Sequence, residues 1–202
     1  MKNSSKKLIL ASASTGRSSV LKNAGVEFLQ ITSGVDEDAL KLEAEKENLS
    51  PEKIAVRLAG AKARAVSLEK LDAFVIGADQ VLQCEGSLFD KPRNAEEALA
   101  HLKIFQGTTH QLISSVALVF KGETRWVHTE TATMTMRPLS DNTLERYLDA
   151  CGPEVLESVG VYRLEGIGAT LFEKIDGDYF TILGLPLLPL LACLRDEEII
   201  SD

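Results

Sequence analysis

The hydrophobic residues of this chain fall in short runs that alternate with segments in which they recur at helical spacing. Leu8 to Ala11 and Phe74 to Ile76 are apolar runs with the length of a buried strand. Between them, Ser50 and Pro51 have the residue types that begin helices, and apolar residues continue at helical spacing to about Leu68. Strands that alternate with helices predict an α/β protein.

The second half of the chain continues this alternation. Asn94, followed by Glu97, is typical of a helix start, and Lys121-Gly122-Glu123 is typical of a hairpin turn between two strands. The predicted strands are residues 110–120 and 125–136, and the predicted helices are residues 94–105, 141–150 and 185–194. Because no repeat or linker interrupts the pattern, we expect a single domain over residues 1–202.

Composition and charge narrow the classes of partner. With 202 residues, of which 45% are hydrophobic and 26% charged, the chain can bury roughly 70% of its unfolded surface. A net charge of −8 without a basic stripe argues against a nucleic-acid polymer. No run approaches the ~18 apolar residues of a membrane span, and Leu8 to Ala11 is too short for a secretory signal of roughly 7–15 apolar residues. We therefore expect a cytoplasmic protein that binds a small molecule and no membrane.

The strand Phe74 to Ile76 leads into a lone carboxylate at Asp79. A buried strand tolerates an ionised group only where that group is paired or bound to a metal, so we expect Asp79 where the strand meets a cleft. Gly77 and Ala78 are small, which would let a ligand approach the backbone closely. The alternative is that Asp79 merely begins a turn at the end of the strand.

A second candidate site follows the first strand, where a loop of small polar residues from Ser12 to Gly16 leads through Arg17 into a helix. Backbone N–H groups at a helix start, hydroxyl groups and a guanidinium together favour a bound anion such as phosphate. The loop is not a Walker loop, because no Gly-Lys-Ser/Thr follows. The alternative is an ordinary helix cap with a solvent-exposed arginine.

On the long helix that begins at Ser50, Lys62 lies beside the apolar stripe rather than opposite it. A lysine in that position can reach the edge of a cleft. The alternative is a surface lysine whose stem covers apolar residues, as with its neighbours Lys53, Arg57 and Arg64.

Taken together, these segments resemble the Maf family of nucleoside triphosphate pyrophosphatases. Eight short segments match in order across about 180 residues, which is hard to obtain by chance although no single one is diagnostic. They are Leu8 to Ser14 with Arg17, Val35-Asp36-Glu37, Ala61-Lys62-Ala63, Gly77-Ala78-Asp79, Lys91-Pro92, Gly107 with Thr109-His110, Asp176-Gly177-Asp178-Tyr179, and Gly184-Leu185-Pro186. The resemblance implies a mixed, twisted sheet flanked by helices, with two lobes around a substrate cleft.

The resemblance also implies the reaction, which is hydrolysis of a nucleoside triphosphate to the monophosphate and pyrophosphate. By this likeness a divalent cation, Mg²⁺, Mn²⁺ or Co²⁺, would be held by carboxylates, with Asp79 as base, metal ligand or both and Glu37 as the second carboxylate. Lys62, Lys91 and Arg17 would neutralise the triphosphate, and two hydroxyl groups, those of Ser12 and Ser14, would donate hydrogen bonds to it. The family further suggests a homodimer.

Three positions bear on which base the site would accept. Gln80 and Glu165 resemble the branch of the family that acts on 7-methyl-GTP rather than the branch that acts on dTTP and UTP. A carboxylate can accept two hydrogen bonds from guanine N1–H and N2–H₂, whereas uracil offers one N–H there. The 7-methyl-GTP branch has a tryptophan where this chain has Gly16, so guanine is favoured and its methylation is left open.

Two functions from different classes remain open. The chain is either a metal-dependent nucleotide pyrophosphatase or a nucleotide-binding regulator of septum formation that has no significant turnover. The presence of Asp79, Lys62 and Lys91 together favours the enzyme. In either case, the resemblance implies that the glycine-rich segment 159–168 closes over the base.

Overall fold

The computed structural model describes residues 6–201, whose strands form one seven-stranded mixed sheet. The strand order is β2-β1-β3-β5-β6-β7, with β4 paired to one end of β3. β1 is parallel to β2 and β3, and the other pairs are antiparallel. The strands are β1 (Lys7–Leu10), β2 (Leu29–Gln30), β3 (Ala73–Cys84), β4 (Ser87–Phe89), β5 (Thr109–Phe120), β6 (Glu123–Met136) and β7 (Phe172–Asp176).

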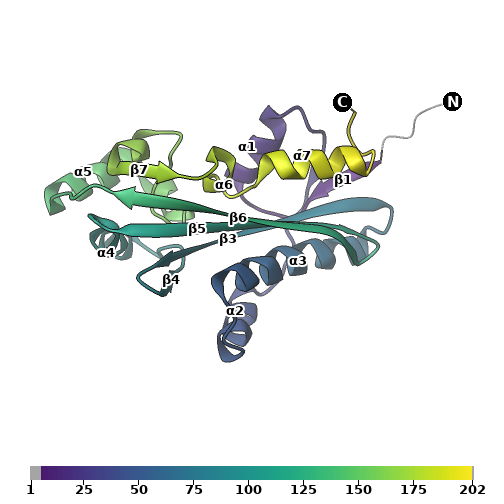
Figure 1. The fold of residues 1–202 in the computed structure, drawn as a ribbon, viewed down its shortest axis with the longest axis horizontal. Helices are drawn as coiled ribbons and strands as arrows, with labels where there is room; N and C mark the ends of the chain where they lie inside the picture. The colour runs from purple at the N-terminus through teal and green to yellow at the C-terminus, as the bar shows by residue number, and fades with distance from the viewer. Residues whose placement is uncertain (1–5, 202) are drawn as a thin grey trace.

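Helices cover both faces of the sheet (Figure 1), with α3 on one face and α1 and α7 on the other. The helices are α1 (Thr15–Asn23), α2 (Glu37–Lys46), α3 (Pro51–Glu69), α4 (Ala95–Phe105), α5 (Asp141–Cys151), α6 (Tyr179–Ile182) and α7 (Leu187–Asp196), with two short 3₁₀ helices, η1 (Pro153–Glu157) and η2 (Ile167–Leu171). The predicted α/β class with a mixed sheet flanked by helices is therefore confirmed.

Local capping explains why the predicted helices begin where they do. The side chains of Ser50, Asn94 and Ser140 each accept a hydrogen bond from the backbone N–H three residues later, at the starts of α3, α4 and α5. The last helix begins at Leu187 rather than at Leu185. Its start is delayed because Pro186, which precedes the first helical residue, has an extended ψ of 87°.

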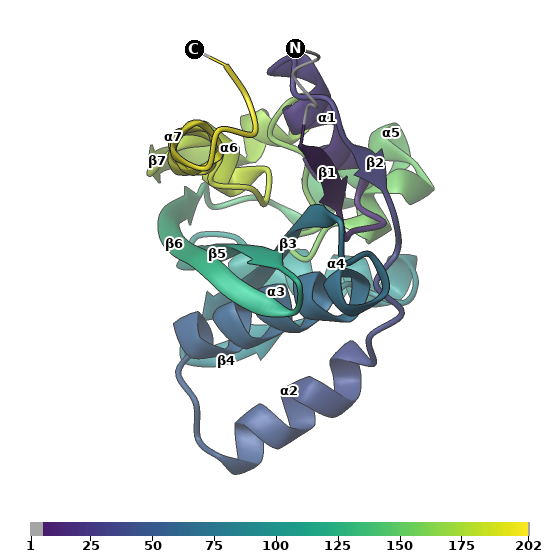
Figure 2. The same cartoon turned by 90° about the vertical axis from the view of Figure 1, so that its right-hand side faces the viewer.

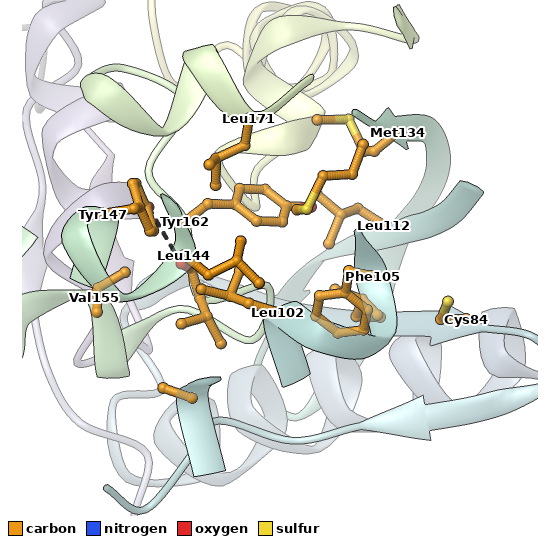
Figure 3. Close-up of a cluster of buried hydrophobic side chains, with 14 of the residues drawn as sticks. Cys84, Leu102, Phe105, Leu112, Met134, Leu144, Tyr147, Val155, Tyr162 and Leu171 are labelled. Atoms are coloured by element: carbon orange, nitrogen blue, oxygen red, sulfur yellow. Dashed lines mark hydrogen bonds between the residues drawn. The ribbon is translucent and has the colours of Figure 1, made fainter. Parts of the chain in front are cut away.

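Two groups of elements lie at the two ends of the long strands β3, β5 and β6 (Figure 1). At one end, α4, α5 and the 3₁₀ helices enclose an apolar core that includes Phe105, Met134 and Tyr162 (Figure 3). At the other end, α1 and α7 pack on the face of the sheet that carries Ile76 and Leu118. These two cores correspond to the two lobes implied by the family resemblance; the cleft between them stays a prediction.

No helix among residues 6–201 has the length and apolar character needed to cross a bilayer.

Candidate active site

A buried lysine joins two carboxylates at the centre of the molecule. The Nζ atom of Lys62, on α3, lies 2.6 Å from Oδ1 of Asp79 on β3 and 2.8 Å from Oε2 of Glu37 at the start of α2. The side chains of Lys62 and Asp79 are each only 7% exposed, whereas that of Glu37 is 43% exposed. The alternative of a surface lysine at position 62 is therefore wrong, and the ammonium is buried because two carboxylates neutralise it.

Asp79 lies inside β3, five residues before its last residue Cys84, so the prediction that it follows the end of a strand is wrong. The strand continues because β5 pairs with it throughout, with Ser115 opposite Asp79. On the other side of β3, pairing with β1 ends at Ile76 and pairing with β4 begins at Leu82. Within the described residues, positions 77–81 therefore have no strand partner on that side, and Asp79 lies at the middle of this unpaired stretch.

Gly77 allows α3 to approach β3 closely enough for the ion pair. A Cβ atom at Gly77 would lie 2.2 Å from the carbonyl oxygen of Ala59 and 2.7 Å from the backbone nitrogen of Ala63. Both residues belong to α3, Ala59 about one turn before Lys62 and Ala63 directly after it. The space beside Gly77 is therefore filled by the helix, and the expectation that a ligand approaches there is wrong.

The loop after β1 has the hydrogen bonds expected of a helix start. Ser14 caps α1 by accepting from the Arg17 N–H at 3.3 Å, and the buried Ser12 hydroxyl accepts from the Ser14 N–H at 3.2 Å. Arg17 donates from Nε to the carbonyl oxygen of Gly184 at 2.9 Å and lies 3.5 Å from the Ser12 hydroxyl through Nη1. The alternative of a solvent-exposed arginine is wrong, since Arg17 is half-buried and fixed at two points.

Electrostatics place Arg17 and Lys91 near the same two carboxylates. Burial lowers the pKa of Arg17, while the charges of Asp79 and Glu37 oppose that shift. The pKa of Lys91 is also lowered, first by partial burial of its ammonium group and then by the positive charges of Arg17 and Lys62, against the attraction of Glu37 and Asp79. Lys62, Asp79 and Glu37 are thus in direct contact, and the charges of Arg17 and Lys91 interact with the same two carboxylates.

Lys41 is a further cation at this site that the sequence interpretation missed. It lies four residues after Glu37 on α2, so the two side chains share one face of the helix. Its ammonium group pairs with Asp90, the residue before Lys91. Burial lowers the pKa of Lys41, but the bond to Asp90 and the charges of Asp90, Asp79 and Glu37 together raise it. The spacing from Glu37 was the only sequence signal that could have indicated it.

Gln80 points to the opposite face of the sheet from Asp79, because successive residues of a strand alternate. Its Nε2 atom lies 2.9 Å from the Ser114 hydroxyl and 3.0 and 3.2 Å from the carbonyl oxygens of Thr181 and Ile182 in α6. The carbonyl of Gly184, which follows α6, binds Arg17. In this structure Gln80 thus holds the segment that positions Arg17.

Glu165 is bound within its own loop. Its Oε1 atom accepts a hydrogen bond from Nε of Arg163 at 3.0 Å, and Arg163 also pairs with Glu154 at 2.8 Å. Tyr162, from the same segment, is buried and bonds His110 at 2.7 Å. Among residues 6–201, neither Gln80 nor Glu165 forms a hydrogen bond or ion pair with the phosphate-site residues, so the base-binding roles of both stay predictions.

Gly16 lies in the first turn of α1, directly after the loop that carries Ser12 and Ser14. A Cβ atom added there would meet nothing closer than 3.8 Å, where the nearest atoms are the Leu183 carbonyl oxygen and the Ser14 hydroxyl. The position therefore has room for a larger side chain, and the glycine is not required by packing.

The carboxylates of this site are suited to a divalent cation that is bound by the substrate phosphates as well as by the protein. Within the described part of the chain, no group of three or more His, Cys, Asp or Glu side chains is placed to hold a metal ion. Asp79 and Glu37 do converge on one point, the Lys62 ammonium. Mg²⁺ is commonly bound by one or two carboxylates together with waters and substrate phosphates, so two carboxylates suffice for that type of site.

Comparisons with known proteins point to one family. The family model described as Maf-like protein matches residues 7–197. A nucleoside triphosphate pyrophosphatase of Nitrobacter hamburgensis is 48% identical, covering 97% of this chain and 96% of its own. Two 7-methyl-GTP pyrophosphatases are similarly close: that of Brucella suis is 50% identical (96% of this chain, 98% of its own) and that of Rhizobium meliloti 48% (94% and 95%).

A solved structure of lipoprotein GNA1162 from Neisseria meningitidis also matches, covering 75% of this chain and 99% of that one. Its TM-score of 0.27 and identity of 13% are too low to bear on the fold. The family model and the full-length relatives show that this chain belongs to the Maf family.

Proposed function

We propose that this protein is a nucleoside triphosphate pyrophosphatase, a hydrolase that cleaves the anhydride between the α- and β-phosphates. The observation that carries the proposal is the buried Lys62 bound to Asp79 and Glu37, with Arg17 and Lys91 close enough to interact with the same carboxylates. The names of the full-length relatives support the same reaction. The substrate is a small-molecule nucleotide.

The residues divide the chemistry between charge neutralisation and proton transfer. Arg17, Lys62 and Lys91 offset the charge of the triphosphate, and the Ser12 and Ser14 hydroxyl groups donate hydrogen bonds to it. Asp79 accepts a proton from the attacking water. The elements of that water are divided between the two products, so that one triphosphate and one water give one nucleoside monophosphate and one pyrophosphate.

A divalent cation, Mg²⁺, Mn²⁺ or Co²⁺, fits this site as a cofactor. Asp79 and Glu37 would hold it together with substrate phosphates and water. When bound, such an ion polarises phosphoryl oxygens and lowers the pKa of a bound water. Lys62 keeps the two carboxylates together before substrate binds.

The substrate we propose is a guanine nucleotide, which includes 7-methyl-GTP. Relatives at about half identity carry both the general name and the 7-methyl-GTP name, which supports this choice. Glu165 carries the preference in the proposal, through the two hydrogen bonds that a carboxylate can accept from guanine. A cytoplasmic location and a homodimer also stay proposals; light scattering of the purified protein tests the second.

The decisive experiment is product analysis with GTP, 7-methyl-GTP, UTP and dTTP, each with Mg²⁺, Mn²⁺ or Co²⁺ and with a chelator control. We expect equal amounts of nucleoside monophosphate and pyrophosphate. Release of inorganic phosphate with a nucleoside diphosphate would overturn the proposed bond specificity. Tight binding of a triphosphate without any product would instead favour the nucleotide-binding regulator.

A further inference from the structure

Lys41 lies one turn after Glu37 on α2, a helix that has little apolar contact with the rest of the protein. Figure 2 shows α2 as the outermost helix on the α3 side of the sheet. Ala44 is the only residue of α2 that is buried, with Leu40 and Leu49 partly buried against the same core. Because this apolar contact is small, ion pairs also help to hold α2 in place.

Three ion pairs connect α2 and its C-terminal end to the body of the protein. Glu37 and Glu47 pair with residues of α3, namely Lys62 and Arg57. Lys41 differs, because its partner is Asp90, in the loop between β4 and α4. That loop also carries Lys91. The Lys41–Asp90 pair therefore joins α2 to the segment that supplies another cation of the phosphate site.

The Lys41–Asp90 pair is of the kind that a stronger anion can replace. The side chain of Asp90 is 70% exposed, and that of Lys41 is 28% exposed. Ion pairs in contact with water contribute little to stability, since hydration and side-chain entropy offset the attraction. A triphosphate carries several charges on oxygens that bond strongly to ammonium groups. Asp90 can therefore turn into solvent while Lys41 binds phosphate.

Two carboxylates of the proposed active site act on the charge of Lys41. Burial lowers the pKa of Lys41, but the bond to Asp90 and the charges of Asp90, Asp79 and Glu37 outweigh that effect and raise it. Asp79 and Glu37 are also the residues proposed to meet the substrate. Lys46, five residues later on α2, is exposed and has no comparable partner among the described residues.

We propose that Lys41 is a further phosphate-binding residue, which leaves Asp90 and binds the triphosphate when substrate enters. This inference rests on the proposed pyrophosphatase function.

The test compares Lys41→Ala with three matched variants: Lys41→Arg, Asp90→Asn and Lys46→Ala. A lost charge-assisted bond to phosphate corresponds to roughly a 10- to 100-fold effect, so Lys41→Ala should raise KM for the triphosphate by about that factor and change kcat less. Lys41→Arg should restore most of the affinity, because it keeps the charge. Lys46→Ala should behave like the parent protein.

Asp90→Asn separates substrate binding from a structural role. If Lys41 binds phosphate, this variant frees it, and KM should stay the same or fall. If the pair only holds α2 in place, Asp90→Asn should raise KM as much as Lys41→Ala does, and that result would overturn the inference.

Calorimetry with pyrophosphate and with a nucleoside monophosphate adds a readout independent of turnover. Lys41→Ala should weaken pyrophosphate binding and leave monophosphate binding nearly unchanged; an equal loss for both would count against a contact with the β- or γ-phosphate. If the parent protein releases no pyrophosphate from any triphosphate, the proposed function fails. Binding of pyrophosphate to the variants still decides the role of Lys41 in that case.

Discussion

Asp79 is paired with Lys62 inside the free protein. Gln80 instead binds a carbonyl group of α6, and Glu165 binds Arg163 in its own loop. Lys62 cannot be buried without its carboxylates, so folding itself assembles that half of the site. No such requirement brings Gln80 and Glu165 together, because each already has a hydrogen-bond partner. The residues proposed to bind phosphate, the phosphate-binding half, are therefore held together in the free protein, whereas those of the proposed base-binding half have separate partners.

Removing the carboxylate at position 79 tests the phosphate-binding half and should have the largest effect. Asp79→Asn should lower kcat by about 10²–10⁴-fold, the usual range for loss of general-base assistance. The fold should persist, because Lys62 keeps Glu37 as a partner. Steady-state kinetics and thermal unfolding measure the two effects separately.

Asp72→Asn is a matched control, since Asp72 forms an exposed ion pair with Lys7 and lies at the start of the same region of chain. It should leave turnover unchanged. Parental rates in Asp79→Asn would refute the role given to Asp79.

Local signals in the sequence were sufficient for much of the fold, because caps and hydrophobic periodicity act over a few residues. They located α3, α4, α5 and the β5–β6 hairpin. They did not show that β3 continues past Asp79, because that depends on β5 pairing across the chain. Lys41 was missed for a related reason. In sequence it resembles Lys46, and only the fold brings Asp90 and the two carboxylates near it.

The second largest effect concerns the base-binding half and is measured by ranking the triphosphates by kcat/KM. If Glu165 accepts two hydrogen bonds from guanine, GTP should exceed UTP and dTTP in kcat/KM by about 30- to 100-fold. Glu165→Gln should narrow or reverse this preference, because the amide replaces one acceptor by a donor. Competition assays with paired triphosphates measure the ranking directly.

Glu154→Gln provides the control for this variant. Glu154 is the other carboxylate bound to Arg163, so its replacement disturbs the same ion-pair group without changing Glu165. The ranking should then stay as in the parent protein. A parent that prefers UTP, with a ranking indifferent to Glu165→Gln, would remove Glu165 from base recognition while leaving the phosphate chemistry intact.

Replacing Gln80 should have a smaller effect than replacing Glu165. Because its amide holds the carbonyls of Thr181 and Ile182, and Gly184 beyond them binds Arg17, Gln80→Ala should loosen Arg17. We expect kcat/KM to fall by about 2- to 10-fold for every triphosphate alike, as for the loss of one or two neutral hydrogen bonds. Substrate panels with GTP, UTP and dTTP measure whether the loss is uniform.

Ser114→Ala is the matched control, since the Ser114 hydroxyl donates to the same Thr181 carbonyl at 2.8 Å. It should act in the same direction and more weakly. In addition, Gln80→Ala combined with Arg17→Ala should cost little more than Arg17→Ala alone. A change in base ranking, with full additivity to Arg17→Ala, would instead make Gln80 a base-binding residue.

The smallest expected effect concerns methylation of the base, at Gly16. An aromatic face attracts a cationic, methylated guanine by about 0.5–1 kcal/mol at an exposed site, which corresponds to roughly a 2- to 5-fold preference. The nearest atoms to an added Cβ are 3.8 Å away, so the backbone accepts a side chain there. Gly16→Trp should therefore raise kcat/KM for 7-methyl-GTP relative to GTP. Gly16→Ala separates the ring from the general effect of a Cβ on helix α1, and it should leave the ratio unchanged. Equal gains for both substrates in the tryptophan variant would mean that the ring does not contact the base, and the base-binding half would then lie away from the start of α1.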